Sequence, residues 1–251
     1  MQELKDKVAI ITGGSGDIGA ATAEEFIKEG ARAVIIADID LEKAEKICSN
    51  LQTGQLNECI AVKTDVTCQE DIKNLFNITI EKYGRLDILV NCAGICPVAY
   101  VDDIGEKEWD RVMDINLKGT YLCCREAVFI MREKKYGKII NLSSIAGRMG
   151  GIVTGVHYAS SKGAIITLTK SFAKLFGTYN ININCLAPGT IESEMTRKWD
   201  NSWKKNILKD IPLGRFGTPL DVANAIVFMA SEKSDFLNGA IIDLNGGAFS
   251  G

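Results

Sequence analysis

The sequence has few of the residues and patterns that mark metal sites. It contains one histidine, His157, and eight cysteines whose spacing fits no zinc site. Cys92 and Cys96 are too far apart for a C-x-x-C pair, and Cys123 and Cys124 are adjacent. We therefore expect no metal ion, and buried free thiols of the kind that a reducing cytosol maintains.

The chain also lacks a strong excess of charge and a long apolar run. Its formal net charge is -3, which gives no electrostatic footprint for nucleic acid or an anionic membrane. The start, MQELKDKVAI, is charged where a secretion signal needs apolar residues, and no apolar run approaches membrane-spanning length. With 251 residues, 46% of them hydrophobic, the chain can bury one large core. We expect a single cytoplasmic domain over residues 1–251.

Short runs rich in β-branched residues alternate with longer stretches of helical character. Strands that are apolar on both faces and separated by helices indicate a parallel sheet covered on both sides. No sequence repeat or linker interrupts the pattern. The sequence predicts an α/β, Rossmann-like doubly wound sheet of about seven parallel strands with helices on both faces. The strand runs are KVAIITGG, RAVIIAD, ECIAVKTD, LDILVNCAG, KIINLSS, ININCLAP and AIIDLNGG.

A glycine-rich turn, TGGSGDIG, follows the first strand run and opens the first helix. In that setting the helix amides and the helix dipole favour a bound phosphate, as in dinucleotide-binding proteins. Gly14, Gly16 and Gly19 match G-x-G-x-x-G. Gly13 and Gly19 instead match two-thirds of a wider-spaced loop whose middle place holds Asp17. The residues alone leave both registers open, and each puts a carboxylate in the loop.

The second strand run ends at Asp38, about 20 residues beyond the turn. A carboxylate there can accept hydrogen bonds from the adenosine ribose hydroxyls, and it would repel a 2′-phosphate. No lysine or arginine follows in the loop. The alternative is a solvated acid at a strand end. We expect NAD rather than NADP as cofactor.

HYASSK places Tyr158 and Lys162 at i and i+4, on one face of a helix. A free tyrosine has a pKa of about 10, which makes it a poor base at neutral pH. A neighbouring ammonium stabilises the phenolate and lowers the tyrosine pKa, so that Tyr158 becomes usable for proton transfer. Alone, such a pair is common and usually lies at the surface.

Five motifs accompany this pair, and together they closely resemble the short-chain dehydrogenase/reductase family. The resemblance runs from about Lys7 to Gly247, with the motifs in family order. IPLGRFGTPLDVA and LNGAIIDLNGG resemble the family's later segments. The five motifs are TGGSGDIG, NCAG (91–94), DINLKG (114–119), NLSSIAG (141–147) and APG (187–189).

The resemblance implies catalytic roles for four residues. Tyr158 resembles the acid/base, and Lys162 resembles the residue that holds the nicotinamide ribose and lowers the tyrosine pKa. Ser144 matches the position that hydrogen-bonds the substrate oxygen. Asn116 matches an asparagine that supports a water-linked proton path to the lysine.

The resemblance also implies a binding path for the dinucleotide. Asp65 resembles a residue near the adenine, and Ile191 and Ser193 occupy places that meet the nicotinamide carboxamide, with serine in place of the usual threonine. Asn91, Ala93 and Gly94 would line the path of the cofactor. Besides Tyr158 and Lys162, the implied cofactor residues are Gly13, Ser15, Gly16, Asp17, Ile18, Gly19, Asp38, Asp65, Val66, Asn91, Ala93, Gly94, Pro188, Gly189, Ile191 and Ser193.

Asp17 is the main departure from the family pattern. The family loop is T-G-x-x-x-G-x-G, and Asp17 stands where its middle glycine is usual; pteridine reductases of the family carry arginine there. A carboxylate about 4 Å from a phosphate charge costs roughly 1 kcal/mol in water. We therefore expect its side chain to turn toward the cleft mouth or solvent, where it can also cap a free helix amide. Backbone amides around Ser15 to Ile18 would then hold the phosphate.

Met195, Trp199, Trp203 and Ile207 fall at a stride of four, which predicts one apolar stripe on a short helix. The resemblance implies a mobile lid over the substrate in this region. The stripe would then either cover an apolar substrate pocket or only pack the helix against the rest of the domain.

Three other side chains are candidates for substrate contact. His157 could tune Tyr158 or touch the substrate, although an incidental role is favoured. Arg148 and Lys198 could reach an anionic substrate group, although solvated surface charge is the commoner role of such residues.

Together these features predict an NAD-dependent short-chain alcohol dehydrogenase or ketone reductase acting on a small molecule. One alternative is a reductase of 3-oxoacyl thioesters, against which Asp38 argues if NADPH is its donor. Another is a dinucleotide-binding regulatory protein without turnover, which would not need Ser144, Tyr158 and Lys162 together. Steroid, polyol and hydroxyacyl substrates all remain open. Since family members commonly form tetramers, and the helices TYLCCREAVFIM and AIITLTKSFAKLF carry surplus apolar surface, we expect a homotetramer.

Overall fold

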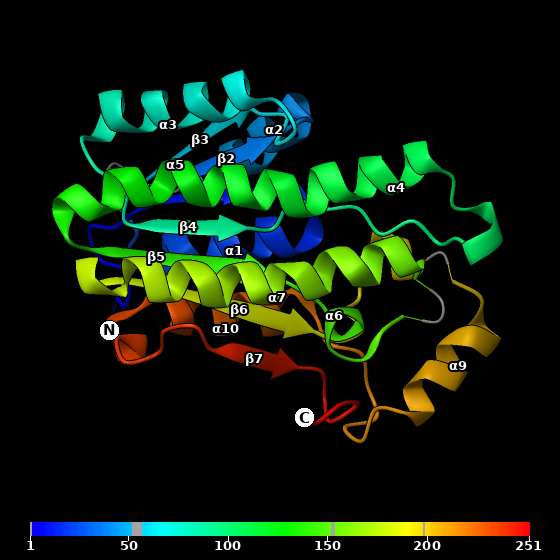
Figure 1. Ribbon diagram of the computed structural model, residues 1–251. Coiled ribbons are helices and arrows are strands. Elements are labelled where there is room, and N and C mark those ends of the chain that lie inside the picture. Colours follow the sequence, from blue (N-terminus) through cyan, green and yellow to red (C-terminus); the bar gives the residue numbers. More distant parts are fainter. Residues whose placement is uncertain (1, 52–56, 152–153, 198) are drawn as a thin grey trace.

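Seven parallel strands form one sheet at the centre of the computed structural model (Figure 1). The structure describes residues 2–51, 57–151, 154–197 and 199–251. The strand order is β3-β2-β1-β4-β5-β6-β7, so the winding direction reverses between β1 and β4. This confirms the predicted Rossmann-like doubly wound sheet. The strands are β1 Val8–Thr12, β2 Ala33–Asp38, β3 Glu58–Lys63, β4 Ile88–Asn91, β5 Gly137–Leu142, β6 Ile181–Pro188 and β7 Ile241–Leu244.

The central strands are apolar on both faces because each face is covered by helices. In β1, Ala9 and Ile11 belong to a core shared with α1, α2 and α10, whereas Val8 and Ile10 belong to a core shared with α3, α5 and α7. Figure 1 shows α3, α5 and α7 in front of the sheet and α1 and α10 behind it. The helices are α1 Asp17–Lys28, α2 Leu41–Leu51, α3 Gln69–Tyr83, α4 Glu106–Met113, α5 Gly119–Lys134, α6 Ile145–Met149, α7 Val156–Phe176, α8 Glu194–Arg197, α9 Asn201–Lys209 and α10 Pro219–Ala230.

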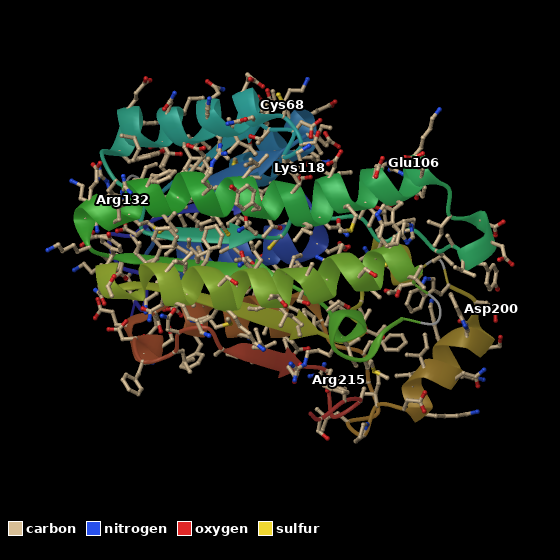
Figure 2. All side chains as sticks on the ribbon, viewed as in Figure 1. Cys68, Glu106, Lys118, Arg132, Asp200 and Arg215 are labelled. Atoms are coloured by element: carbon tan, nitrogen blue, oxygen red, sulfur yellow. The ribbon has the colours of Figure 1, made fainter. Side chains whose placement is uncertain are left out.

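The sequence predicted that Met195, Trp199, Trp203 and Ile207 lie on one helix after β6. This prediction is wrong, because the segment forms two short helices, α8 and α9. Asp200 caps the start of α9 by accepting a 2.7 Å hydrogen bond from the Ser202 amide, and it lies at the outer end of that helix (Figure 2). Trp199 therefore lies between α8 and α9, although its ring still packs on Trp203 at a centroid distance of 5.2 Å. The Met195 side chain lies outside the described residues.

All eight cysteines are thiols outside any disulfide, and Cys48, Cys59, Cys123, Cys124 and Cys185 are buried. Within the described ranges, no group of three or more histidine, cysteine, aspartate or glutamate side chains is placed to hold a metal ion. Across the same ranges, no helix is both long and apolar enough to cross a membrane.

Candidate active site

The candidate site residues gather at one edge of the sheet. In a parallel sheet all carboxyl ends lie at the same edge, and ligands bind in the crevice where the winding reverses. In Figure 1, α4, α6 and α9 lie beyond the arrowheads at this edge. Three of these residues are the last residues of their strands: Asp38 in β2, Asn91 in β4 and Pro188 in β6. Others come shortly after a strand: the glycine turn after β1, Asp65 after β3 and Ser144 after β5.

The glycine turn is packed so closely that three of its glycines have no room for a side chain. Gly13 has a φ of +62°, and a Cβ there would lie 2.6 Å from the backbone of Ala93. A Cβ on Gly19 would lie 2.5 Å from the Gly13 carbonyl oxygen, and one on Gly14 would meet Ile36 at 2.7 Å. Gly16 is the least constrained, since the nearest atom to its Cβ would be the Gly13 oxygen at 3.4 Å. The contact between Gly13 and Gly19 favours the wider-spaced register.

The turn presents the start of α1 without a side-chain cap. Gly16 is the N-cap of α1 and makes no side-chain cap hydrogen bond. The first amides of a helix need partners from outside the helix, and a phosphate oxygen is a suitable one. The chemistry of this turn therefore fits the diphosphate of a dinucleotide, with Ser15 to Gly19 as the residues that would hold it.

Asp38 is nearly buried, with 9% of its surface exposed, and it is fixed against the turn. One carboxylate oxygen accepts a 2.9 Å hydrogen bond from the Ser15 amide, and the other accepts a 3.1 Å bond from the Asp40 amide. Each oxygen keeps a further lone pair, which suits the two hydroxyls of a ribose. The sequence pattern missed Lys63, which is exposed and is the register partner of Asp38 on β3. Lys63 brings a cation to the strand next to Asp38.

Asp65 and Val66 form the turn after β3. One oxygen of the Asp65 carboxylate accepts hydrogen bonds from the amide and the hydroxyl of Thr67, at 2.8 and 2.7 Å. Val66 is buried against the start of α5, where a Cβ on Gly119 would lie 2.8 Å from its Cγ2. These contacts fix the turn at the edge of the sheet, beyond Asp38.

The side chain of Asn91 points into the core, so only its backbone could line the path of the cofactor. Its amide nitrogen donates to Asn141 Oδ1 at 2.8 Å and to the Cys124 thiol at 3.3 Å, and the residue is 3% exposed. The side chain therefore ties β4 to β5 and α5 inside the core. Ala93 does reach the turn after β1, because its amide donates to Thr12 Oγ1 at 3.4 Å.

Asn116 links the loop after β4 to α7. It lies in a π-helical turn, Asp114–Lys118, between α4 and α5. Its side chain bonds both the amide and the carbonyl of Ile95, at 2.8 and 3.0 Å, and donates to Ser161 Oγ at 3.0 Å. A Cβ on Gly94 would lie 3.2 Å from Asn116 Oδ1 and 3.4 Å from Lys162 Nζ, so Gly94 leaves the space between them open.

Ser144, Tyr158 and Lys162 come together from two neighbouring elements. Ser144 is the N-cap of α6, and its hydroxyl accepts a 3.1 Å bond from the Ala146 amide. Its side chain lies close enough to the Tyr158 hydroxyl to lower the pKa of that group. Lys162 lies one turn along α7, with its Nζ 5.8 Å from the centre of the Tyr158 ring and 2.8 Å from the Leu142 carbonyl oxygen.

Burial affects the pKa of both Tyr158 and Lys162. Burial raises the pKa of Tyr158 above its ordinary value, and this effect outweighs that of Ser144, which lowers it. Burial also lowers the pKa of Lys162. In this structure the Lys162 ammonium donates to the Leu142 carbonyl, and burial is the largest influence on the pKa of Tyr158.

Cys96 is a member of this group that sequence reasoning missed. Its thiol lies beside the Tyr158 hydroxyl, and burial raises the pKa of the Cys96 thiol to about 11. The thiol is therefore protonated and adds no charge beside the phenol at neutral pH. No spacing rule marks this cysteine, since it lies two residues beyond the NCAG motif.

The segment after β6 approaches the same edge. Within it, Ser193 and Thr196 cap each other: the Ser193 amide donates to Thr196 Oγ1 at 2.8 Å, and the Thr196 amide donates to Ser193 Oγ at 3.2 Å. Ile191 is nearly buried and forms a β-bridge with Gly217. A Cβ on Gly189 would lie 2.9 Å from Asn245, so the chain after Pro188 passes closely over the end of β7.

Asp17 turns away from the amides of its own helix, toward this segment. Asp17 Oδ2 accepts a 2.8 Å hydrogen bond from the Glu194 amide, and Oδ1 lies 3.4 Å from Arg197 Nη2. The expectation that the side chain turns aside is met by the geometry. The option that it caps α1 is wrong, since Gly16 is the uncapped N-cap and Asp17 caps an amide of α8 instead.

Of the three candidates for substrate contact, Arg148 is engaged elsewhere, His157 is buried, and Lys198 lies outside the described residues. The side chain of Arg148 donates to Asp243 Oδ2 at 3.1 Å and to the carbonyl of Gly251 at 3.0 Å, so it holds the C-terminal residues rather than a ligand. His157 is fully buried and finds no hydrogen-bond partner among the described residues.

Comparisons with known proteins agree with this geometry. The model of a family described as "Enoyl-(Acyl carrier protein) reductase" matches residues 14–248. An uncharacterized oxidoreductase of Mycobacterium bovis is 38% identical over 251 residues, covering 98% of each chain. The 3-oxoacyl-[acyl-carrier-protein] reductase FabG of Thermotoga maritima is 38% identical over 244 residues, covering 97% of this chain and 98% of the other.

A solved structure extends the similarity to three dimensions. The 3-oxoacyl-[acyl-carrier protein] reductase of Brucella melitensis superposes with a TM-score of 0.92 at 32% identity, covering 100% of this chain and 94% of the other. The sheet order, the motifs at its carboxyl edge and these similarities lead to one conclusion: the chain belongs to the short-chain dehydrogenase/reductase family of oxidoreductases.

Proposed function

We propose that the protein interconverts a secondary alcohol and a ketone with NAD as cofactor. The observation that carries this proposal is the group formed by Ser144, Tyr158 and Lys162 beside the glycine turn. A protein that only bound a dinucleotide would need the turn and Asp38, but it would not need a partly buried pair of hydroxyls with an ammonium beside it.

The residues divide the chemistry among them. A bound nicotinamide dinucleotide supplies the group that exchanges a hydride with the substrate carbon. Ser144 holds the substrate oxygen, and Tyr158 exchanges a proton with it. Because burial keeps the Tyr158 phenol neutral, it is prepared to donate its proton to a ketone oxygen at neutral pH. Alcohol oxidation needs the phenolate and is therefore favoured by alkaline pH.

Lys162 would hold the cofactor ribose. Its ammonium has three N–H donors, and it makes one hydrogen bond with the described residues, to the Leu142 carbonyl. The remaining donors face the space that Gly94 leaves open beside Asn116. Two ribose hydroxyls fit donors placed in this way.

The assay that tests the proposal follows the absorbance of the reduced nicotinamide. Purified protein is given NADH or NADPH with a panel of ketones, and NAD or NADP with the matching alcohols. We expect turnover of at least one ketone with NADH at neutral pH. Binding of a dinucleotide without turnover of any panel member would support the regulatory alternative.

A reductase of 3-oxoacyl thioesters is the second candidate. It is favoured by the names of the relatives from Thermotoga maritima and Brucella melitensis. The panel therefore includes 3-oxoacyl thioesters. A preference for these substrates with NADPH would replace the first proposal by the second.

Replacing Asp38 by alanine is expected to reduce the preference for NAD over NADP by about tenfold or more. The carboxylate would lose two roles, acceptor for the ribose hydroxyls and repeller of a 2′-phosphate, and the exposed Lys63 would remain beside the site. The ratio of kcat/KM for the two cofactors measures this change. Asp40→Ala, two residues along the same loop, is the control. A wild-type protein that already uses both cofactors equally would contradict the role of Asp38.

The proposal includes a homotetramer in the cytoplasm. The outer faces of α5 and α7 carry exposed apolar side chains, including Tyr121, Phe129 and Leu175, whose burial a second copy would provide. Eight cysteines without a disulfide suit a reducing compartment. Sedimentation at micromolar concentration should give the mass of four chains, and a monomer would refute this part of the proposal.

A further inference from the structure

The carboxylate of Asp17 joins two parts of the proposed site that lie far apart in the sequence. Asp17 is the first residue of α1, at the phosphate-binding turn, and its two partners belong to α8, after β6. The bond from the Glu194 amide spans 177 residues of sequence, and the contact with Arg197 spans 180. No other side chain of the turn TGGSGDIG has a hydrogen bond to α8 among those that the structure describes.

The segment that Asp17 holds is itself internally fixed. Ser193 and Thr196 cap each other, and Thr196 Oγ1 also donates to the Ile191 carbonyl at 3.2 Å. Lys204 of α9 donates to the Arg197 carbonyl at 3.0 Å, which ties α9 to α8. The hydrogen bond at Glu194 therefore holds a larger unit in place, which consists of residues 191–197 and the start of α9.

We propose that Asp17 is a positioning residue that latches the segment Ser193–Arg197 onto the phosphate-binding turn and so slows the release of bound dinucleotide. This inference rests on the proposed binding of a dinucleotide. The phosphates of such a ligand would lie on the turn, and its nicotinamide end would meet Ser193. The ligand would then be enclosed between the turn and α8, which Asp17 connects. The ligand can leave only when the hydrogen bond to the Glu194 amide breaks.

The direction in which removal of the Asp17 carboxylate changes the release rate of the dinucleotide distinguishes two possible roles of that charge. A carboxylate that acted mainly by repelling the phosphates would speed release, so its removal would slow release. A carboxylate that acts as a latch slows release, so its removal speeds release. The bond to the Glu194 amide is charge-assisted and short, whereas the contact with Arg197 is longer and its guanidinium is exposed. The amide bond should therefore carry most of the effect.

Stopped-flow fluorescence of NADH and of NADPH measures the release rate directly. We expect Asp17→Ala to release the reduced dinucleotide about tenfold faster, with an unchanged association rate. Asp17→Asn keeps an oxygen that can accept from the Glu194 amide, so its release rate should stay within about threefold of wild type. Arg197→Gln should behave like Asp17→Asn. Glu24→Gln, which changes a carboxylate on the exposed side of α1, should leave the rate unchanged.

Hydrogen exchange of the protein without ligand gives a second readout. The Glu194 amide should exchange about tenfold faster in Asp17→Ala than in Asp17→Asn or wild type, because only alanine removes its acceptor. Slower release from Asp17→Ala, unchanged release, or equal rates for the alanine and asparagine variants would overturn the latch and leave the cofactor proposal standing. A wild-type protein that binds neither NADH nor NADPH would overturn both.

Discussion

Tyr158→Phe is expected to lower kcat by about a hundredfold to ten-thousandfold while the dinucleotide still binds, since a positioned general acid contributes that much. The phenylalanine ring fills the same buried volume on α7, so only the hydroxyl beside Ser144 and Cys96 is lost. Steady-state kinetics on the best substrate of the panel measures kcat, and fluorescence titration with the reduced cofactor measures its dissociation constant.

The pH dependence of the wild-type enzyme provides an independent check on Tyr158. Burial raises the pKa of the phenol, so the proton-donating form persists from neutral into alkaline pH. The kcat for ketone reduction should therefore stay level through neutral pH, whereas the kcat for alcohol oxidation should rise with pH. If Tyr158→Phe retains more than a few per cent of kcat, Tyr158 is not the acid.

Lys162→Met is expected to harm both chemistry and cofactor binding, each by about tenfold or more. Methionine keeps much of the buried stem but removes the ammonium that holds the Leu142 carbonyl and that would hold the ribose. The dissociation constant of the dinucleotide and kcat at saturating cofactor separate the two effects. Lys170→Met is the matched control, because Lys170 is an exposed lysine on the same helix. A change in only one of the two parameters would contradict the double role.

The burial that shifts the pKa of Lys162 also decides how its substitution acts on stability. Desolvation lowers the pKa of this ammonium, so the charged form is a cost to the folded state that methionine does not carry. We therefore expect Lys162→Met to fold as well as the wild type. A large loss of thermal stability would mean that the bond to Leu142 outweighs that cost.

The sequence by itself determined the sheet and pointed to the residues of the candidate site. Runs such as VAII in β1 are apolar at four successive positions, which only a strand covered on both faces requires. The other signals are local patterns: glycines followed by the start of a helix, an acidic residue at the end of the second strand, and a Y-x-x-x-K pair. Local backbone geometry dictates such patterns, so they are readable without knowing what lies nearby in space.

The tertiary structure decided where individual side chains point and which charges they carry. Three contacts depend on crossover connections that bring distant residues together. They are the contact of Asn91 with Asn141 in the core, the contact of the Cys96 thiol with Tyr158, and the hydrogen bond from the Glu194 amide to Asp17. The raised pKa of Tyr158 has the same origin, because it depends on how deeply the packed helices bury the phenol. Sequence spacing carries no information on contacts between residues 177 positions apart, because such contacts arise from the packing of whole elements rather than from local backbone preference.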